Sequence, residues 1–290
     1  MSGPEQLASF AQNEQVWLLG GVFAVAALIE SLRPERTRIL PRGWRWATNL
    51  GLHLFGQWVF LAMLPASIAV WFLLKIGRPH VAAFAPVGAW GGVWAVFAAA
   101  LVVLDLASYL EHRLMHAFFP LWRMHSVHHS DIDVDAATAI RHHPFEIIFS
   151  GMTMLMLVLV IGMPPWALPV YATLALAVQL PQHANLRLPA GLDAALGLVL
   201  MTPGLHRAHH AVTPEHYNSN FGTVLSVWDR FFRTLVPPLP EKNPPDFGVT
   251  PFLAERYARP HWALLLPFVL RRETPAEGEP QPLATPQRRA

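Results

Sequence analysis

Three apolar runs dominate the sequence and occur near 15–32, 52–75 and 86–110. Each matches the roughly 17–25 residues with which a helix crosses a bilayer. Charged residues make up only 14% of the chain, against roughly 25% in an ordinary soluble domain. Inside lipid, the backbone must satisfy its own hydrogen bonds, which restricts it to helices or a closed barrel. Because no segment alternates like a strand, we predict an all-α integral membrane protein.

A fourth apolar run, 147–181, is interrupted by GMPPW at 162–166. Two consecutive prolines cannot continue a helix, so this run is predicted to form a hairpin of two shorter spans. The first fifteen residues contain no Lys or Arg, and no small-residue cleavage pattern follows them. The first run is therefore predicted to be a retained span and not a signal peptide.

The C-terminal part contains shorter apolar segments. The run 192–201 has ten residues and is too short to span a membrane. HWALLLPFVLRR at 261–272 is predicted to be an interfacial helix with basic flanks. The tail 273–290 is rich in Pro and Glu and is predicted to be disordered.

Arginine is concentrated in the loop after the first run. RPERTRILPRGWR at 33–45 holds five Arg and one Glu, and short basic loops mark the cytoplasmic side. Span counting then places the segments after the third run and after the hairpin on this same face. We therefore expect a multi-pass protein of the inner or cell membrane. The net charge of +2 is small, so no nucleic-acid partner is expected.

Histidine recurs on this face in three short boxes. HRLMH spaces two histidines four residues apart, while HSVHH and HRAHH share the pattern His-x-x-His-His. Side chains three and four residues apart share one face of a helix, so each box can direct its rings at one point. Solvated histidines on surface helices would explain a single box but not three. The eight box residues are His112, His116, His125, His128, His129, His206, His209 and His210.

Eight imidazoles exceed the needs of one metal ion, since zinc takes three or four protein ligands. The chain has no cysteine, which excludes thiolate sites and iron–sulfur clusters. Two metal ions suit the boxes, although imidazole binds iron, zinc, copper and nickel alike. Thr202 and Pro203 precede the third box and are predicted to be its N-cap and first helical residue.

Two further polar residues lie on the helical stripe of the first box. Asp105 and Tyr109 precede His112 and His116 in the spacing i, i+4, i+7, i+11. A carboxylate inside a membrane span usually has a function, and orienting the second ring nitrogen of a metal ligand is one such function. A hydrogen bond that packs two spans together is the alternative for Asp105.

Five segments together resemble the fatty acid hydroxylase/sterol desaturase superfamily. They are DLASYLEHRLMH, HSVHHSDIDVDAATAIRHHPFE, QHANLRLP, TPGLHRAHH and NSNFGTVLSVWDRFFRTL, in this order over 105–235. The resemblance implies a membrane-bound, non-haem di-iron oxygenase that uses O2 and external electrons to hydroxylate or desaturate a lipid. The lipid, of sterol, fatty acyl, ether-lipid or carotenoid type, would enter from the bilayer.

The resemblance also implies how the site is built. Two iron ions (Fe2+/Fe3+) would be held by the eight box histidines and by His183 of QHANL. His143 and Glu146 of RHHPFE are predicted to support these ligands from behind. Because no His-Pro-Gly-Gly stretch of a fused cytochrome b5 occurs, the electron donor would be a separate ferredoxin-like or cytochrome-like protein. The sequence leaves open whether three neighbouring residues contact the metal: Gln179, His142 and His216.

The expected fold is an all-α bundle of about four to five transmembrane helices, two of them forming a short hairpin. A cytoplasmic helical cap would hold the histidine-rich dimetal site. We expect N-terminal transmembrane helices over 1–100, a hydroxylase/desaturase-like domain over 101–240, and a C-terminal segment over 241–290 with the interfacial helix and the tail.

Two other classes of protein compete with the oxygenase. A zinc membrane hydrolase would need His-Glu-x-x-His, whereas here Glu111 precedes His112 and Arg113 follows it. The other class is a non-enzymatic membrane protein that binds or transports metal or haem. Metal transport would predict polar residues along several spans, but the first, fourth and fifth predicted spans carry almost none. Haem held by two histidines would also leave most of the boxes unexplained.

Overall fold

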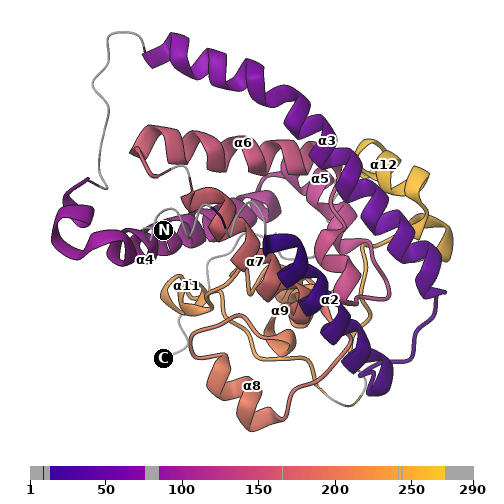
Figure 1. The fold of residues 1–290 in the computed structure, drawn as a ribbon. Coiled ribbons are helices and arrows are strands. Elements are labelled where there is room, and N and C mark those ends of the chain that lie inside the picture. Colours follow the sequence, from indigo (N-terminus) through magenta and orange to yellow (C-terminus); the bar gives the residue numbers. More distant parts are fainter. Residues whose placement is uncertain are drawn as a thin grey trace, which may run out of the picture.

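The computed structural model describes residues 9, 14–75, 85–164, 166–240, 242 and 244–271 (Figure 1). The regular secondary structure of this part of the chain is entirely helical, with two isolated β-bridges and no strand. The tail predicted to be disordered and most of the KIGRPH loop lie outside the described residues.

Four described helices are long and apolar enough to cross a membrane. Their outward faces carry large apolar side chains, such as Trp17 at 79% exposure and Trp58 at 66%. Surfaces of this kind are stable in lipid and costly in water, so the chain is a multi-pass membrane protein. The four helices are α2 (Gln15–Leu32), α3 (Arg42–Lys75), α4 (Ala85–Ala117) and α6 (Pro144–Ile161).

The fourth apolar run forms the predicted hairpin. α6 ends at Gly162, whose φ of 75° is left-handed and so favours glycine. The chain resumes as α7 (Ala167–His183), which packs against α2 and α4. With 17 residues, α7 is not one of the four long helices.

α3 contains the apolar run 52–75 and begins earlier, at Arg42. Its first turns make buried polar contacts with the rest of the protein. Farther along, α3 lies against α6. A Cβ at Gly56 would lie 3.2 Å from the backbone of Pro144, and a Cβ at Gly151 would collide with the Phe60 ring. These glycines therefore allow the two helices to approach closely, as small residues do in membrane bundles.

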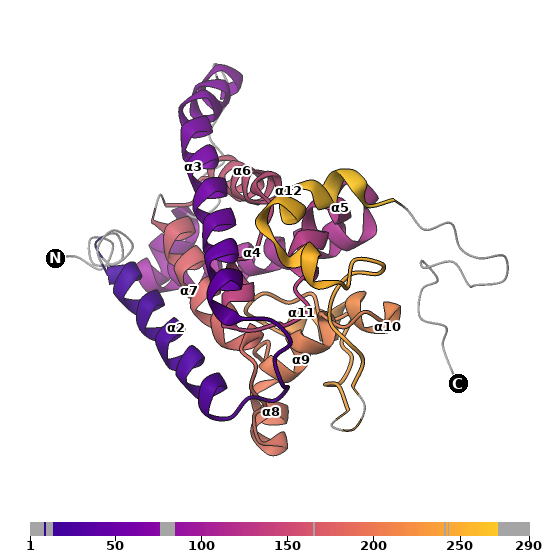
Figure 2. The ribbon, with the colours of Figure 1, turned by 90° about the vertical axis from the view of Figure 1, so that its right-hand side faces the viewer.

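The remaining elements are short and lie together on one side of the long helices (Figure 2). The predicted fold class, an all-α membrane bundle with a helical cap, is confirmed. The predicted interfacial segment is helical over 260–269, and the ten-residue run is helical only at its start. The cap consists of α5 (Phe119–His129), η2 (Ala136–Ile140), α8 (Ala190–Leu196), α9 (Pro203–His209), α10 (Pro214–Tyr217), α11 (Val227–Phe231), η3 (Glu255–Ala258) and α12 (Pro260–Val269).

Candidate metal centre

The three boxes and His183 meet where four helices converge. α4 carries the first box near its C-terminal end, α5 carries the second, α7 ends at His183, and α9 with its C-cap carries the third. The start of α9 is as predicted, since the Thr202 hydroxyl accepts a hydrogen bond from the Leu205 amide at 3.3 Å and Pro203 is the first helical residue.

The nine rings form two adjacent groups, in each of which one nitrogen of every ring lies within 4.8 Å of the others. The second and third boxes each contribute to both groups. The rings of His129 and His210, one from each group, stack at a centroid distance of 4.6 Å. The first group is His112, His116, His125, His129 and His209, and the second group is His128, His183, His206 and His210.

Backbone carbonyls determine which nitrogen carries the proton in several of the rings. His112 Nδ1 lies 2.8 Å from the carbonyl oxygen of Phe221, and His209 Nδ1 lies 2.7 Å from that of Ser219. His183 Nδ1 lies 2.8 Å from the carbonyl oxygen four residues before it. A carbonyl only accepts, so Nδ1 donates in each ring and Nε2 presents a lone pair.

These lone pairs face other ring nitrogens. His112 Nε2 lies 3.0 Å from His125 Nε2 in the first group. In the second group, His183 Nε2 lies 3.1 Å from His128 Nε2 and 2.9 Å from His206 Nε2. In the His112–His125 pair, acceptors face both Nδ1 atoms, so the two Nε2 atoms meet with lone pairs. Such lone pairs repel each other, whereas a cation held by both is stabilised.

Other buried nitrogens in the first group have no hydrogen-bond partner. They are both ring nitrogens of His116 and Nε2 of His129 and of His209. Burial lowers the pKa of His129 and His209 well below the usual range, and neighbouring histidines lower it further. The rings are therefore neutral, as metal ligation requires. Unpaired buried nitrogens are costly unless something occupies them, so these residues fit a nitrogen-bound metal pair.

Glu146, in the first turn of α6, lies behind the first group. Its carboxylate accepts hydrogen bonds from Nδ1 of His125 at 2.7 Å and from Nδ1 of His142 at 3.0 Å. The first bond orients His125 with Nε2 toward His112, as an outer partner of a metal ligand does. His142 also stacks on His128, with ring centroids 4.6 Å apart.

Comparisons with known proteins agree with this geometry. Residues 97–234, which contain all nine histidines, match the sequence profile of the fatty acid hydroxylase family. This segment, just under half of the chain, is thus similar to the fatty acid hydroxylase family. The resemblance inferred from the boxes is confirmed.

By their names, three curated relatives are a lipid hydroxylase, a monooxygenase and an aldehyde decarbonylase. Ornithine lipid hydroxylase OlsE of Rhizobium tropici is 30% identical over 160 residues, which are 54% of this chain and 46% of that protein. Alkylglycerol monooxygenase of Danio rerio is 33% identical over 161 residues, 56% of this chain and 34% of that protein. The chain thus spans less than half the length of these two relatives. Very-long-chain aldehyde decarbonylase GL1-9 of Oryza sativa subsp. indica is 27% identical over 239 residues, 80% of this chain and 89% of that protein. No solved structure matches the chain significantly.

Asp105 makes its hydrogen bonds to groups other than the nine histidine rings. Its carboxylate accepts hydrogen bonds from the backbone amides of Val224 and Leu225, at 3.0 and 3.1 Å. It also accepts from Trp228 Nε1 at 2.8 Å and from the Tyr171 hydroxyl at 3.1 Å. The prediction that Asp105 orients a ligand histidine is therefore wrong. The reason is distance, since Asp105 lies two helical turns, about 10 Å, before the first box.

Tyr109 supports the same C-terminal segment of the family domain. Its hydroxyl lies 2.9 Å from Thr234 Oγ1, and its ring stacks on Phe232 with centroids 5.2 Å apart. Asp229, which the sequence analysis missed, accepts hydrogen bonds from the amides of Phe221 and Gly222, both at 2.8 Å. These contacts hold the Phe221 carbonyl that accepts from His112, so their effect on the rings is indirect.

The role of His143 also differs from the predicted one. Its Nδ1 accepts a hydrogen bond from the Phe145 amide at 3.2 Å, which caps the start of α6. His142, its neighbour, is the partner of Glu146 instead. The chain is extended at His143, and successive side chains of an extended chain point to opposite sides.

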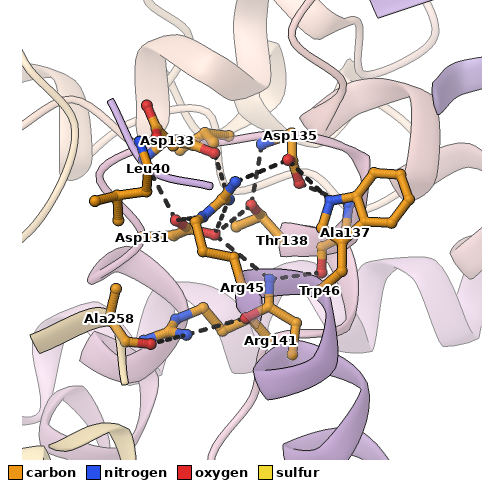
Figure 3. A network of polar contacts seen from close by, with 12 residues as sticks. Leu40, Arg45, Trp46, Asp131, Asp133, Asp135, Ala137, Thr138, Arg141 and Ala258 are labelled. Atoms are coloured by element: carbon orange, nitrogen blue, oxygen red, sulfur yellow. Dashed lines mark hydrogen bonds and ion pairs between the residues drawn. The ribbon is translucent and has the colours of Figure 1, made fainter. Parts of the chain in front are cut away.

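A buried polar network holds the end of α5 in the hydroxylase-family domain (Figure 3). Arg45 of α3 donates to both carboxylate oxygens of Asp131, at 3.1 and 2.7 Å, and to Asp135 at 2.9 Å. Each of these three side chains is only 1% exposed. Because Asp131 follows His129 by two residues, the ion pair between Arg45 and Asp131 fixes the position where the second box ends.

Arg141 extends this network to a ring of the second group. Its guanidinium donates to the Val127 carbonyl at 2.9 Å and to Asn49 Oδ1 at 3.0 Å. Its own carbonyl lies 3.3 Å from His128 Nδ1. The network was not predicted, because Arg45 was interpreted as a cytoplasmic surface charge and its acidic partners lie 86 and 90 residues later.

Replacing Glu146 with glutamine should weaken metal binding by about 10–100-fold, as for other residues that orient a ligand. The amide removes the charge against His125 Nδ1 and with it the preference for one ring orientation. The matched control is Glu111→Gln, since Glu111 of the adjacent α4 bonds the Thr153 hydroxyl and no ligand ring. Iron affinity measured by chelator competition checks this prediction. Equal losses of iron affinity in both variants would show that Glu146 does not act by orienting His125.

Proposed function

We propose that the protein is a membrane-bound, non-haem di-iron oxygenase that acts on C–H bonds of a lipid. The observation that supports this best is the pair of imidazole groups, of five and four rings, in which unpaired or mutually facing nitrogens lie together. Haem ligation uses one or two histidines, and a hydrolytic zinc about three, so neither explains both groups.

The nine histidines would hold one iron in each group. When bound, the iron pair supplies the redox chemistry by which O2 oxidises a C–H bond. The carbonyls of Phe221 and Ser219 and the carboxylate of Glu146 hold the rings in their orientations. Most of the rings are almost completely buried, so the protein excludes water from the reacting atoms. The two groups do not include the three neighbours whose contact with metal the sequence left open, Gln179, His142 and His216.

A lipid substrate fits the position of the site. The first box ends one residue before the end of α4, which is a candidate span, so the first group lies where a bilayer lipid can approach sideways. Trp122 and Tyr217 form an aromatic wall here, with Trp122 at a ring distance of 4.8 Å from His116. Two relatives are a hydroxylase and a monooxygenase by name, which favours hydroxylation over desaturation.

The reaction needs electrons from outside the site. We propose a separate ferredoxin-like or cytochrome-like donor that approaches the cap from the cytoplasm. The catalytic part would be 101–240, with transmembrane helices over 1–100 before it and the interfacial segment over 241–290 after it.

Topology provides a prediction of its own. With the basic loop at 33–45 inside, a reporter fused after residue 240 should behave as cytoplasmic and one near residue 80 as external. Paired phosphatase and fluorescent-protein fusions measure this in whole cells. If both fusions report the same side of the membrane, the proposed cytoplasmic site is wrong.

Oxygen labelling tests the function. The iron-loaded protein, incubated with lipid extract, a chemical reductant and 18O2, should transfer the heavy isotope to one lipid class. Comparing lipids of cells with and without the gene should identify the same class. If neither experiment changes any lipid while the metal is present, the protein is not a lipid oxygenase.

A further inference from the structure

A groove lies between the candidate span of α3 and the start of α12. It has a volume of about 580 Å3, within the range of small-molecule sites, which is roughly 300–1,000 Å3. On α3 its lining recurs every three or four residues from Trp44 to Phe55, so one helix face forms one wall. Leu264 and the start of α12 form the other wall.

The lining of the groove is mainly apolar and contains one basic residue. This residue is Arg259, directly before α12, and its side chain is exposed. Among the residues that the structure describes, no carboxylate pairs with it. α12 starts at Pro260 without a side-chain cap, and such a helix start adds further positive potential. The part of the groove beside Arg259 therefore suits an anion.

The length of the groove suits one leaflet of a bilayer. From Trp44 to Phe55, α3 rises about 16 Å, close to half of the roughly 30 Å hydrocarbon thickness. Both residues lie in the candidate span Arg42–Pro65. The Trp44 end lies at the start of that span, where aromatic and basic side chains meet headgroups.

The groove is separate from the metal centre. Leu52, which lines it, packs with Val127, Ala263 and Leu266 in a buried apolar cluster. This cluster lies between the groove and α5, so a chain in the groove does not reach the rings. The occupant is therefore a lipid of the surrounding bilayer and not the molecule being oxidised.

We infer that this groove binds one anionic phospholipid, with an acyl chain along α3 and its phosphate against Arg259. The site stands apart from the proposed catalytic function, because the binding does not involve the metal ligands. Since α12 also packs on α5, the lipid would steady the helix beside the second box.

Gly51 offers a way to close the groove without disturbing the fold. A Cβ at Gly51 meets nothing within 4 Å, and the same holds at Gly43, which does not line the groove. Leucine at either position raises helix propensity equally. Gly51→Leu therefore fills the groove, and Gly43→Leu is its matched control.

The full-length, metal-loaded protein is reconstituted in phosphatidylcholine discs with or without phosphatidylglycerol, and retained lipid is counted by native mass spectrometry. The wild type and Gly43→Leu should retain one phosphatidylglycerol per chain, while Gly51→Leu should lose it with unchanged metal content. Arg259→Gln should lower the preference for phosphatidylglycerol about fivefold, and Arg259→Lys should keep it.

Three results would overturn the inference. Gly51→Leu retaining lipid like the wild type would show that the groove is not the site. Equal retention of phosphatidylcholine and phosphatidylglycerol by the wild type would exclude selection by Arg259. A dimer that Gly51→Leu breaks would assign the groove to a second copy of the chain.

Discussion

Replacing His209 with alanine should lower iron binding and lipid oxidation by more than about 100-fold, beyond the range for residues that only orient a ligand. His209 is completely buried, its Nδ1 is bonded to the Ser219 carbonyl, and its Nε2 has no partner. Alanine removes that nitrogen from the first group without exposing a charge, so the protein should remain inserted and folded.

The matched control is His216→Ala. His216 lies in the same segment, and its Nδ1 is 2.7 Å from Thr213 Oγ1, but it belongs to neither group. Iron content and product formation are measured on both variants after membrane extraction. Wild-type iron occupancy in the His209 variant would refute the assignment of this ring as a ligand.

Replacing Arg45 with methionine should destabilise the protein by about 3–5 kcal/mol, the usual effect of removing one partner of a buried ion pair. The substitution leaves Asp131 and Asp135 buried at 1% exposure without their cation. Because Asp131 closely follows the second box, iron affinity should fall together with stability. The midpoint of thermal unfolding in detergent and iron affinity by chelator competition measure the two effects.

Two further variants distinguish the effect of breaking a buried ion pair from the effect of removing any one cation. Arg187→Met removes a cation from a partly exposed pair with Glu35, at 34% exposure of the arginine side chain, and should cost about 0–1 kcal/mol. Adding Asp131→Asn to Arg45→Met should recover part of the loss, since it removes a stranded charge. If Arg45→Met destabilises the protein no more than Arg187→Met does, the network does not hold the site.

The sequence predicted those parts of the protein that depend on local spacing. Runs of apolar residues gave the four long helices and the hairpin, because helix length and bilayer thickness are linked. Spacings of three and four brought the rings of each box to one side of its helix. Thr202 and Pro203 predicted the start of α9, since capping involves only neighbouring residues.

Contacts between distant segments were not predictable in the same way. Asp105 shares a stripe with His112, yet three of its four hydrogen-bond partners are supplied by residues 224–228, more than a hundred positions later. His142 and His143 cannot be distinguished by spacing alone, because the extended backbone between them decides which one faces Glu146.

Arg45 illustrates the same limit for charge. Its loop is basic, as cytoplasmic loops are, but Arg45 itself is buried against two aspartates of the cap. A count of basic residues cannot show which of them reach solvent.

The metal content of the purified protein tests the central proposal most directly. The protein is expressed with iron, extracted in mild detergent, and analysed for all transition metals per chain. Two groups of imidazoles, five rings and four, predict two irons per chain and no haem absorption. One metal ion per chain, or zinc retained in preference to iron, would contradict the di-iron oxygenase.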